Sequence, residues 1–186
     1  MPAFPRFVAF GLLSLALTGP ARAGIIGGSD LITNADLAKL EGWLGEGPLD
    51  ITNIFDHTYR DGKDSSNFHA AADGKGRTFV VLRAITPTGS VIIGGYNPRS
   101  WNASLSSYVL TPDAADRTAF VFNLTNDLVQ RQNADATGEY QTYNQSNYGP
   151  TFGGGHDIVV YTNLESGYEK NWSRSWRSRR DCSACR

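Results

Sequence analysis

Short runs of β-branched and aromatic residues, separated by turn-forming residues, recur along this chain and predict a mainly β fold. Ile158 to Tyr161 place four such residues in succession, which is typical of a buried strand. Arg77 to Ile85 is dense in Val, Phe and Leu, and a Pro-Thr-Gly turn joins it to Val91 to Ile93. This spacing predicts a hairpin at the centre of the fold.

Three other stretches have a less regular pattern. Ala119 to Leu124 predicts another strand, and Leu49 to Phe55 predicts a short one. The side chains of the first are expected to divide between two faces, with Phe120 and Phe122 on one and Val121 and Leu124 mostly on the other. Asn126 to Tyr148 is polar and rich in Asn, Gln and Tyr, so we expect loops around one short strand.

Two short helices are expected before the hairpin. Thr33 and Asp36 have the spacing of a capping box, and Gly45 ends the helix that they open. This helix carries three leucines on one face: Leu37, Leu40 and Leu44. A second helical segment continues from Asn67 to Ala72, capped by the residue at position 64 or 65 and stopped by the glycines at 74 and 76.

A glycine-rich stretch from Tyr148 to Thr162 organises the predicted fold. Gly149 and Pro150 form a turn signal, and Phe152 is the expected plug into the core. Three glycines then allow backbone angles or close approaches that a Cβ forbids: Gly153, Gly154 and Gly155. In the hairpin, Gly94 and Gly95 predict a bulge or close packing of another backbone.

A phosphate-binding loop is the functional alternative for the glycine triplet. Such a loop lies between a strand and a helix, whereas here the glycines precede a strand. His156 and Asp157 follow the glycines, and the Asp157 carboxylate would repel a phosphate. We therefore interpret the stretch as structural.

Many strands and few short helices predict a mainly β domain with flanking helices (α+β), built as a two-sheet antiparallel β-sandwich. Several segments of the chain resemble the TLDc domain family. That family typically has a strand, a DG turn, a Ser/Phe-His helical segment ending near a Gly, a strand pair whose second member ends Gly-Gly-Tyr near a Trp, and a later FGGG(H)D strand. The matching segments are Asp61-Gly62, Ser66 to His69, Gly76 to Ala84, Val91 to Tyr96 with Trp101, and Phe152 to Asp157. The resemblance implies a β-sandwich flanked by helices.

The resemblance ends at the C-terminal tail. After Trp172 and Trp176 the chain is rich in arginine and offers no strand-forming run. This leaves open whether the sandwich keeps its last strand, and it predicts an open sheet edge or a divergent or truncated tail. Cys182 and Cys185 lie in this tail with C-x-x-C spacing, so they are expected to close a small disulfide or to remain exposed thiols.

The first 23 residues differ in kind from the rest. They hold Arg6, an apolar run from Phe7 to Leu17, and the A-x-A sequence Ala21-Arg22-Ala23 before Gly24, which together predict a cleaved secretory signal peptide. The apolar run is shorter than the ~20 residues that span a membrane, so no stable membrane insertion is expected after cleavage. The predicted organisation is a signal peptide at 1–23, a TLDc-like domain at 24–176 and a basic tail at 177–186, in a secreted or periplasmic protein.

Charge is unevenly placed along the mature chain. Residues 24–166 carry 9 basic and 16 acidic residues, whereas 167–186 carry 6 basic and 2 acidic residues. An acidic body with a short basic tail is not typical of a nucleic-acid-binding protein. With 186 residues and 40% hydrophobic content, the chain has enough residues for one domain with a real core.

Candidate catalytic chemistry is sparse. No G-x-S-x-G elbow is present, and the three histidines lie at no known metal spacing from the nearby aspartates, so neither a metal nor another cofactor is expected. His69, His156 and Asp157 are the weak candidates for a catalytic group. The residues of the structural motif are Phe152, Gly153, Gly154, Gly155, His156, Asp157, Gly94, Gly95 and Trp101.

Two classes of function follow. The favoured one is an exported, non-enzymatic TLDc-domain protein with a binding or protective role, because the resemblance implies resistance to oxidative stress. In eukaryotes the family also binds the vacuolar proton pump, which an exported chain would not meet, so the protein partner is left unknown. The alternative is a secreted hydrolase or metal-dependent enzyme that uses His69, His156 and Asp157.

Overall fold

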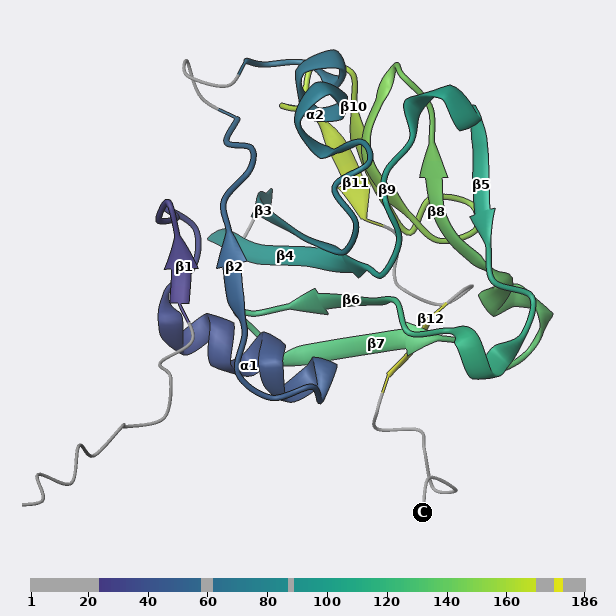
Figure 1. Ribbon diagram of the computed structural model, residues 1–186, viewed down its shortest axis with the longest axis horizontal. Coiled ribbons are helices and arrows are strands. Elements are labelled where there is room, and N and C mark those ends of the chain that lie inside the picture. The colour runs from purple at the N-terminus through teal and green to yellow at the C-terminus, as the bar shows by residue number, and fades with distance from the viewer. Residues whose placement is uncertain (1–23, 58–61, 87–88, 170–175, 179–186) are drawn as a thin grey trace, which may run out of the picture.

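The computed structural model describes residues 24–57, 62–86, 89–169 and 176–178 of the 186-residue chain. Two five-stranded sheets, both antiparallel, form its centre (Figure 1). The first sheet has the strand order β12-β7-β6-β4-β3. Its strands are β3 (Thr78–Thr86), β4 (Gly89–Asn97), β6 (Phe120–Asn123), β7 (Leu128–Gln132) and β12 (Trp176–Ser178).

The second sheet has the strand order β11-β10-β9-β8-β5. Its strands are β5 (Ser107–Leu110), β8 (Tyr140–Asn144), β9 (Tyr148–Phe152), β10 (Ile158–Tyr161) and β11 (Gly167–Glu169). A parallel pair, β1 (Gly24–Ile26) and β2 (Asp50–Thr52), flanks the sheets with helices α1 (Asn34–Leu44) and α2 (Ser65–Ala72). Three short 3-10 turns occupy Ala103–Leu105, Ala114–Asp116 and Ala136–Glu139. The predicted class of mainly β sandwich with flanking helices is confirmed.

The space between the two sheets is filled by an aromatic and aliphatic cluster, here called the inter-sheet core. It joins both sheets and helix α2 through Phe68, Ala72, Val80, Trp101, Ala119, Val121, Phe152 and Ile158. Phe152 is fully buried, and its ring meets Trp101 edge-on at 5.5 Å between centroids. A Cβ on Gly95 would lie 2.6 Å from the Phe152 ring, so this position holds glycine because the ring occupies the space.

Helix α1 covers the outer face of the first sheet (Figure 1). Leu40 packs there against Phe120 and Phe122 of β6, and Trp43 adds a ring contact to Phe122 at 6.0 Å. The expected capping box is present, since the Thr33 hydroxyl accepts from the Asp36 amide while the Asp36 carboxylate accepts from the Thr33 amide. Gly45 ends the helix with a φ of 79°, a left-handed angle that favours glycine.

The predicted hairpin is the longest strand pairing among the described residues. Strands β3 and β4 pair over nine residues each without a register shift, so the hairpin contains no bulge. A Cβ on Gly94 would overlap the carbonyl oxygen of Val80 in the neighbouring strand. Close packing is therefore the reason for the two glycines, and the alternative of a bulge is wrong.

Several expectations about the second half of the chain are wrong in detail. Gly149 and Pro150 are not a turn but lie inside β9, where Gly149 leaves room for the side chains of Val160 and Leu164. The stretch 126–148 contains two full strands, β7 and β8, because side-chain pairing across a sheet outweighs the polar composition of each strand. Leu124 lies in the same cluster as Phe120 and Phe122, as alternation over two residues requires.

The N-terminal elements and the tail also differ from expectation. The strand expected over Leu49 to Phe55 is shorter, limited to β2. The expectation that no strand follows Trp176 is wrong, because β12 pairs with β7 in the register Trp176 to Gln132 and adds a strand at that sheet edge. Backbone hydrogen bonding explains this strand, which apolar alternation does not predict. The signal peptide, the Asp61 turn, Cys182 and Cys185 lie outside the described residues.

Candidate functional site

His69 lies on helix α2, which Asp64 caps. The Asp64 carboxylate accepts from the Ser66 hydroxyl and from the amides of Asn67 and Ser66, and these hydrogen bonds lower the pKa of Asp64. This cap sets the first residue of the helix. Phe68 and His69 then lie on the buried face of the helix, toward the sheets. Phe68 then packs edge-on against Trp101 in the inter-sheet core, with 5.4 Å between ring centroids.

The His69 ring joins helix α2 to the turn between β8 and β9. Its Nδ1 lies 2.7 Å from the Asp73 carboxylate, and its Nε2 lies 3.1 Å and 3.0 Å from the carbonyl oxygens of Gln145 and Tyr148. All three partners are oxygen acceptors, and each ring nitrogen lies within hydrogen-bond distance of at least one of them. The ring is 6% exposed, and both of its nitrogens are engaged in contacts that hold the fold together.

The Asp73 carboxylate extends this junction. Its second oxygen accepts from the amide of Ala103 at 2.7 Å, and the neighbouring amide of Asn102 donates to Asn144 at 2.9 Å. These contacts connect the end of α2 to the segment before β5 and to β8. The His69 and Asp73 pair is therefore the centre of a structural junction of four chain segments.

The other two candidates lie in the turn between β9 and β10. Gly153 and Gly155 have φ of 81° and 79°, and His156 adopts a φ of 61°, which is uncommon for a residue with a side chain. Asp157 is 2% exposed, and its amide donates to the Phe152 carbonyl at 2.8 Å. The glycines of the predicted motif thus form a tight turn. At Gly155 the positive φ requires glycine, because no other part of the protein lies close to the position of a Cβ.

The structure does not gather the three candidates into one catalytic group. Tyr148 contacts two of them through different atoms, because its carbonyl accepts from His69 while its ring packs edge-on against His156 at 5.6 Å. Phe152 and Gly95 do come together with Trp101, in the inter-sheet core. The predicted motif therefore divides into a buried part around Phe152 and a surface part around His156.

The surface part continues into a group of rings, here called the tyrosine cluster, whose members come from β5, β8, β9 and the β9–β10 turn. Its members are Tyr108, Tyr140, Tyr143, Tyr148 and His156. Tyr108 and Tyr143 are direct partners in the sheet, and their ring centroids lie 4.8 Å apart. The His156 ring lies 5.0 Å from Tyr143 and 6.0 Å from Tyr108. All five rings are half-buried and reach the surface.

Tyr108 connects the cluster to the glycine turn. Burial raises the pKa of Tyr108, and the nearby Tyr143, Tyr140 and Tyr168 hydroxyls add to this, while a hydrogen bond from the Gly155 amide opposes it. The phenol is therefore neutral at physiological pH and accepts from the turn. Next to the cluster, Tyr161 and Tyr168 form a further ring pair at 6.2 Å, with 42% and 39% of their surface exposed.

Sequence reasoning missed the tyrosine cluster. It treated the tyrosines between 126 and 148 as loop residues and gave His156 a role in catalysis or structure. A signal was present, because Tyr140, Tyr143 and Tyr148 recur in a segment without charge. Only the pairing of β8 with β5 and β9 shows that these rings meet Tyr108.

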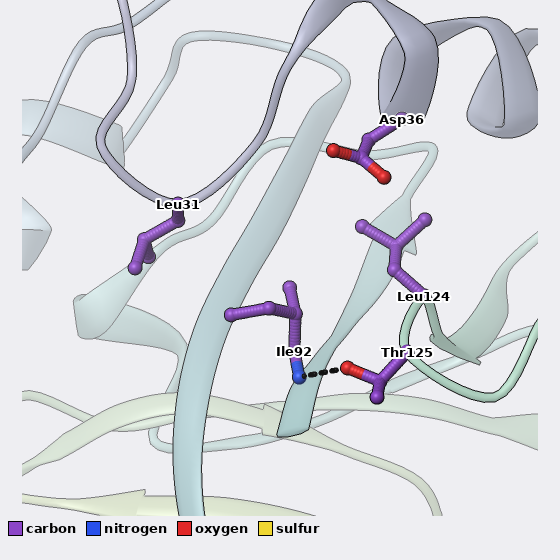
Figure 2. Close-up of a pocket in the computed structure, with 5 residues that line it drawn as sticks. All are labelled: Leu31, Asp36, Ile92, Leu124 and Thr125. Carbon is purple, nitrogen blue, oxygen red and sulfur yellow. Dashed lines mark hydrogen bonds between the residues drawn. The ribbon is translucent and has the colours of Figure 1, made fainter. Parts of the chain in front are cut away.

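A small hollow lies on the opposite side of the fold, next to α1. Figure 2 shows its lining, with Asp36 and Leu124 facing it and the Ile92 amide donating to Thr125 at 2.8 Å. Its volume is about 90 Å³, far below the roughly 300 Å³ at which pockets for small-molecule ligands begin. The Asp36 carboxylate already accepts from the amide and hydroxyl of Thr33. The hollow therefore fits a few water molecules better than a substrate.

The described residues hold neither a cluster of metal-ligating side chains nor a helix suited to spanning a membrane. No three His, Cys, Asp or Glu side chains within them gather as ligands for a metal ion. None of their helices is both long and apolar enough to cross a membrane.

Comparison with known proteins gives one finding. The family model of the TLDc domain matches residues 26–181, which is most of the chain and includes the tyrosine cluster and β12. No curated protein and no solved structure matches the chain.

Proposed function

This chain belongs to the TLDc domain family, and we propose that it is an exported protein that acts by binding, without catalysis, in a protective role linked to oxidative stress. The non-catalytic part of the proposal is supported by one observation. His69, the most plausible acid or base among the candidates, has both ring nitrogens engaged with Asp73 and two backbone carbonyls. A general base must instead offer a free nitrogen to its substrate.

The enzymatic alternative requires His69, His156 and Asp157 to act together. His156 belongs to the tyrosine cluster, where three of its contacts are tyrosine rings, and Asp157 is buried behind the turn. A partly exposed group of tyrosines is a better binding surface than a catalytic one, because tyrosine supplies a large contact area at low entropic cost.

Export and protection have separate support. Residues 1–23 have the composition of a signal peptide. The link to oxidative stress is supported by the family alone. Both parts can be tested in a bacterial host that produces the full chain.

Mass spectrometry of the exported fraction is the first test. Gly24 should be the new N-terminus. Intact Met1 in a soluble cytoplasmic form would contradict export. Survival under hydrogen peroxide should then rise in cells that export the protein and not in cells that produce only residues 24–186. Equal survival of the two would contradict a protective role outside the cytoplasm.

Purified protein tests the absence of catalysis. We expect it to consume no more than one equivalent of peroxide per chain and to hydrolyse no ester, peptide or glycoside in a standard panel. Turnover that is lost in His156→Ala, with the melting temperature preserved, would establish the enzymatic alternative. His57→Ala is the matched control, because this histidine lies outside the tyrosine cluster and outside the candidate group.

A further inference from the structure

We propose that Tyr108 and Tyr143, in the tyrosine cluster, form a covalent dityrosine link when the protein meets a one-electron oxidant. The link is a carbon–carbon bond between the two rings, and it joins strand β5 to strand β8. This modification site goes beyond the proposed function, because it requires neither export nor a binding partner. The distance between the rings, the strand register and the lack of sulfur-containing side chains in the domain support it.

The two rings are nearly as close as bonded rings. Their centroids lie 4.8 Å apart, which is the shortest separation among the tyrosine pairs of the described residues. Two phenol rings joined by a carbon–carbon bond of about 1.5 Å have centroids about 4.3 Å apart. The pair therefore needs only a small approach, which rotation of the side chains within their rotamers supplies.

The strand register aligns the carbons that react. Tyr108 and Tyr143 are direct partners in the antiparallel pairing of β5 with β8, so their side chains leave the same face of the sheet side by side. The ring carbons beside their hydroxyls therefore lie at similar heights above the sheet. In the pair Tyr161 and Tyr168, the direct partner of Tyr168 is Val159, so these two rings are offset and lie 6.2 Å apart.

Hydrogen bonds at the hydroxyls hold both rings in this position. Tyr143 donates to the side-chain oxygen of Gln145, and the Tyr108 oxygen accepts from the Gly155 amide. Coupling joins ring carbons beside the hydroxyls and not the oxygens, so these contacts orient the rings without occupying the atoms that form the bond. Both rings are half-buried and reach the surface, so a small oxidant in solution can take electrons from them.

Side chains that would compete for the oxidant are missing from this part of the chain. Cysteine thiolates and methionine thioethers are common targets of oxidants. Residues 24–181 contain neither cysteine nor methionine. Trp101 is protected in the inter-sheet core, with 1% of its surface exposed. Oxidising equivalents that reach the domain therefore fall on aromatic rings, and the tyrosine cluster gathers four of the eight tyrosines.

The reaction consumes two equivalents of the oxidant for each link. Each phenol gives up one electron to the oxidant and one proton to water, and becomes a phenoxyl radical. The two radicals pair their unpaired electrons in a new bond between the carbons beside the oxygens. Each of these carbons then releases its hydrogen as a proton, and each oxygen takes up a proton again. The linked protein has therefore lost two electrons and two protons in total.

The link constrains an edge strand. Strand β5 is the last strand of the second sheet and pairs with β8. A covalent bond between positions 108 and 143, which are 35 residues apart, removes conformations from the unfolded chain, as a disulfide does. The linked chain should therefore unfold at a higher temperature than the unlinked chain.

Brief illumination of the full exported chain with a ruthenium trisbipyridyl complex and persulfate tests the inference. Each persulfate ion accepts two electrons and becomes two sulfate ions. Cys182 and Cys185 are first alkylated so that their thiols do not react. At low protein concentration, we expect the characteristic fluorescence of dityrosine in a monomer whose mass is lower by two hydrogen atoms.

Digestion with trypsin locates the link. Peptide 100–117 carries Tyr108 as its only tyrosine, and peptide 132–170 carries the other tyrosines of the cluster. We expect these two peptides to be joined. A link between Tyr161 and Tyr168 would instead leave peptide 132–170 alone and lighter by two hydrogen atoms, because both tyrosines lie within it.

Conservative variants separate this pair from its neighbours. Tyr143→Phe keeps the ring but cannot form a phenoxyl radical, so the yield of joined peptides should fall at least about tenfold. Tyr108→Phe should lose them to the same extent. Tyr140→Phe is the matched control, because Tyr140 also contacts Tyr108, at 5.1 Å, but is not its direct strand partner, and it should keep most of the yield. Thermal unfolding before illumination checks that each variant is folded.

The linked chain, separated from the unlinked chain, should melt at least about 3 °C higher. Several outcomes would overturn the inference. They are the absence of joined peptides, an equal yield in Tyr143→Phe, covalent dimers as the main product at low protein concentration, and a linked chain that melts no higher than the unlinked one. None of these bears on the proposed function, which fails only if the assays of export, turnover or protection fail.

Discussion

The inter-sheet core and the tyrosine cluster are both networks of aromatic rings in edge contact, and strand β9 contributes to both. Phe152, at one end of β9, is fully buried, whereas Tyr148, at its other end, is half-buried at the surface. The core uses Phe and Trp, with a single polar atom satisfied by the bond from Trp101 Nε1 to Thr78 at 2.9 Å. In the tyrosine cluster every ring carries a polar atom.

This difference in polar atoms indicates a different role for each network. Rings without hydroxyl groups gain most when water is excluded, so the inter-sheet core stabilises the fold. Rings that keep a hydroxyl at the surface remain available to a partner, at little cost to the fold. Removing a ring should therefore lower stability in the core and lower binding in the cluster.

The largest effect is expected from Phe152→Ala. Deleting this ring leaves a cavity beside Trp101 and Gly95, which should cost about 3–5 kcal/mol in the free energy of unfolding. Tyr143→Ala should cost less than half as much because its ring is half-exposed. Urea unfolding followed by circular dichroism measures both. Equal losses would abolish the distinction between the two networks.

Glycine substitutions are expected to have the next largest effect on stability. They distinguish a position where a neighbouring side chain excludes a Cβ from one where a positive φ favours glycine. Gly95→Ala should cost about 1–3 kcal/mol, because its Cβ would press on the Phe152 ring. Gly155→Ala meets no atom within 4 Å but has a φ of 79°, so backbone strain should cost about 1–2 kcal/mol.

The double variant Gly95→Ala with Phe152→Leu separates these causes. It should recover part of the loss at Gly95, because the smaller side chain makes room for the Cβ. The same Phe152→Leu change should not rescue Gly155→Ala. If it rescued both to the same extent, the cost at Gly155 would not come from local backbone strain.

Tyr108→Phe should have a smaller effect, of about 1 kcal/mol at neutral pH, because the Gly155 amide loses its acceptor. Thermal unfolding measures it. A matched Tyr140→Phe variant should change less, since no backbone donor holds that hydroxyl to the turn among the described contacts.

Alkaline pH sharpens this comparison. The pKa of Tyr108 is raised in the folded state, so its contribution is fully present below the unfolded pKa of about 10 and is lost as pH rises through the folded pKa. The stability advantage of the unchanged chain over Tyr108→Phe should therefore shrink above about pH 10. An advantage that stays constant to about pH 12 would contradict the proposed environment of this hydroxyl.

The smallest effect is expected from Asp64→Asn at the start of α2, the helix that brings Phe68 to the core. Asn still caps a helix, so the fold should be kept. The pKa of Asp64 is lowered by its hydrogen bonds to Ser66 and Asn67, so its charged form stabilises the helix above the unfolded pKa of about 3.9. This benefit should disappear as pH falls through the lower, folded pKa. The stability of the unchanged chain and of Asp64→Asn should be compared at neutral pH and at about pH 2. An equal stability difference at both pH values would contradict this role of the Asp64 charge.

Local patterns in the sequence predicted those parts of the fold that depend on neighbours in the chain. The capping box at Thr33 and Asp36 needs only a few consecutive residues, and the paired strands β3 and β4 are neighbours along the chain. Phe152 also could be assigned to the core, because it is a large apolar residue in a glycine-rich stretch. These features are local, and the hydrophobic effect and backbone sterics act on them directly.

The tertiary structure decided the rest, because it depends on which strands pair. Tyr108 and Tyr143 are 35 positions apart, and only the pairing of β5 with β8 makes them neighbours. The three residues of β12 form a strand only because β7 offers an edge to them. His69 could be read from the sequence as a catalyst or as a core residue, and the positions of Asp73, Gln145 and Tyr148 around its ring decided between them. Long-range pairing of this kind leaves no periodic trace in one sequence, since each partner satisfies only its own local pattern.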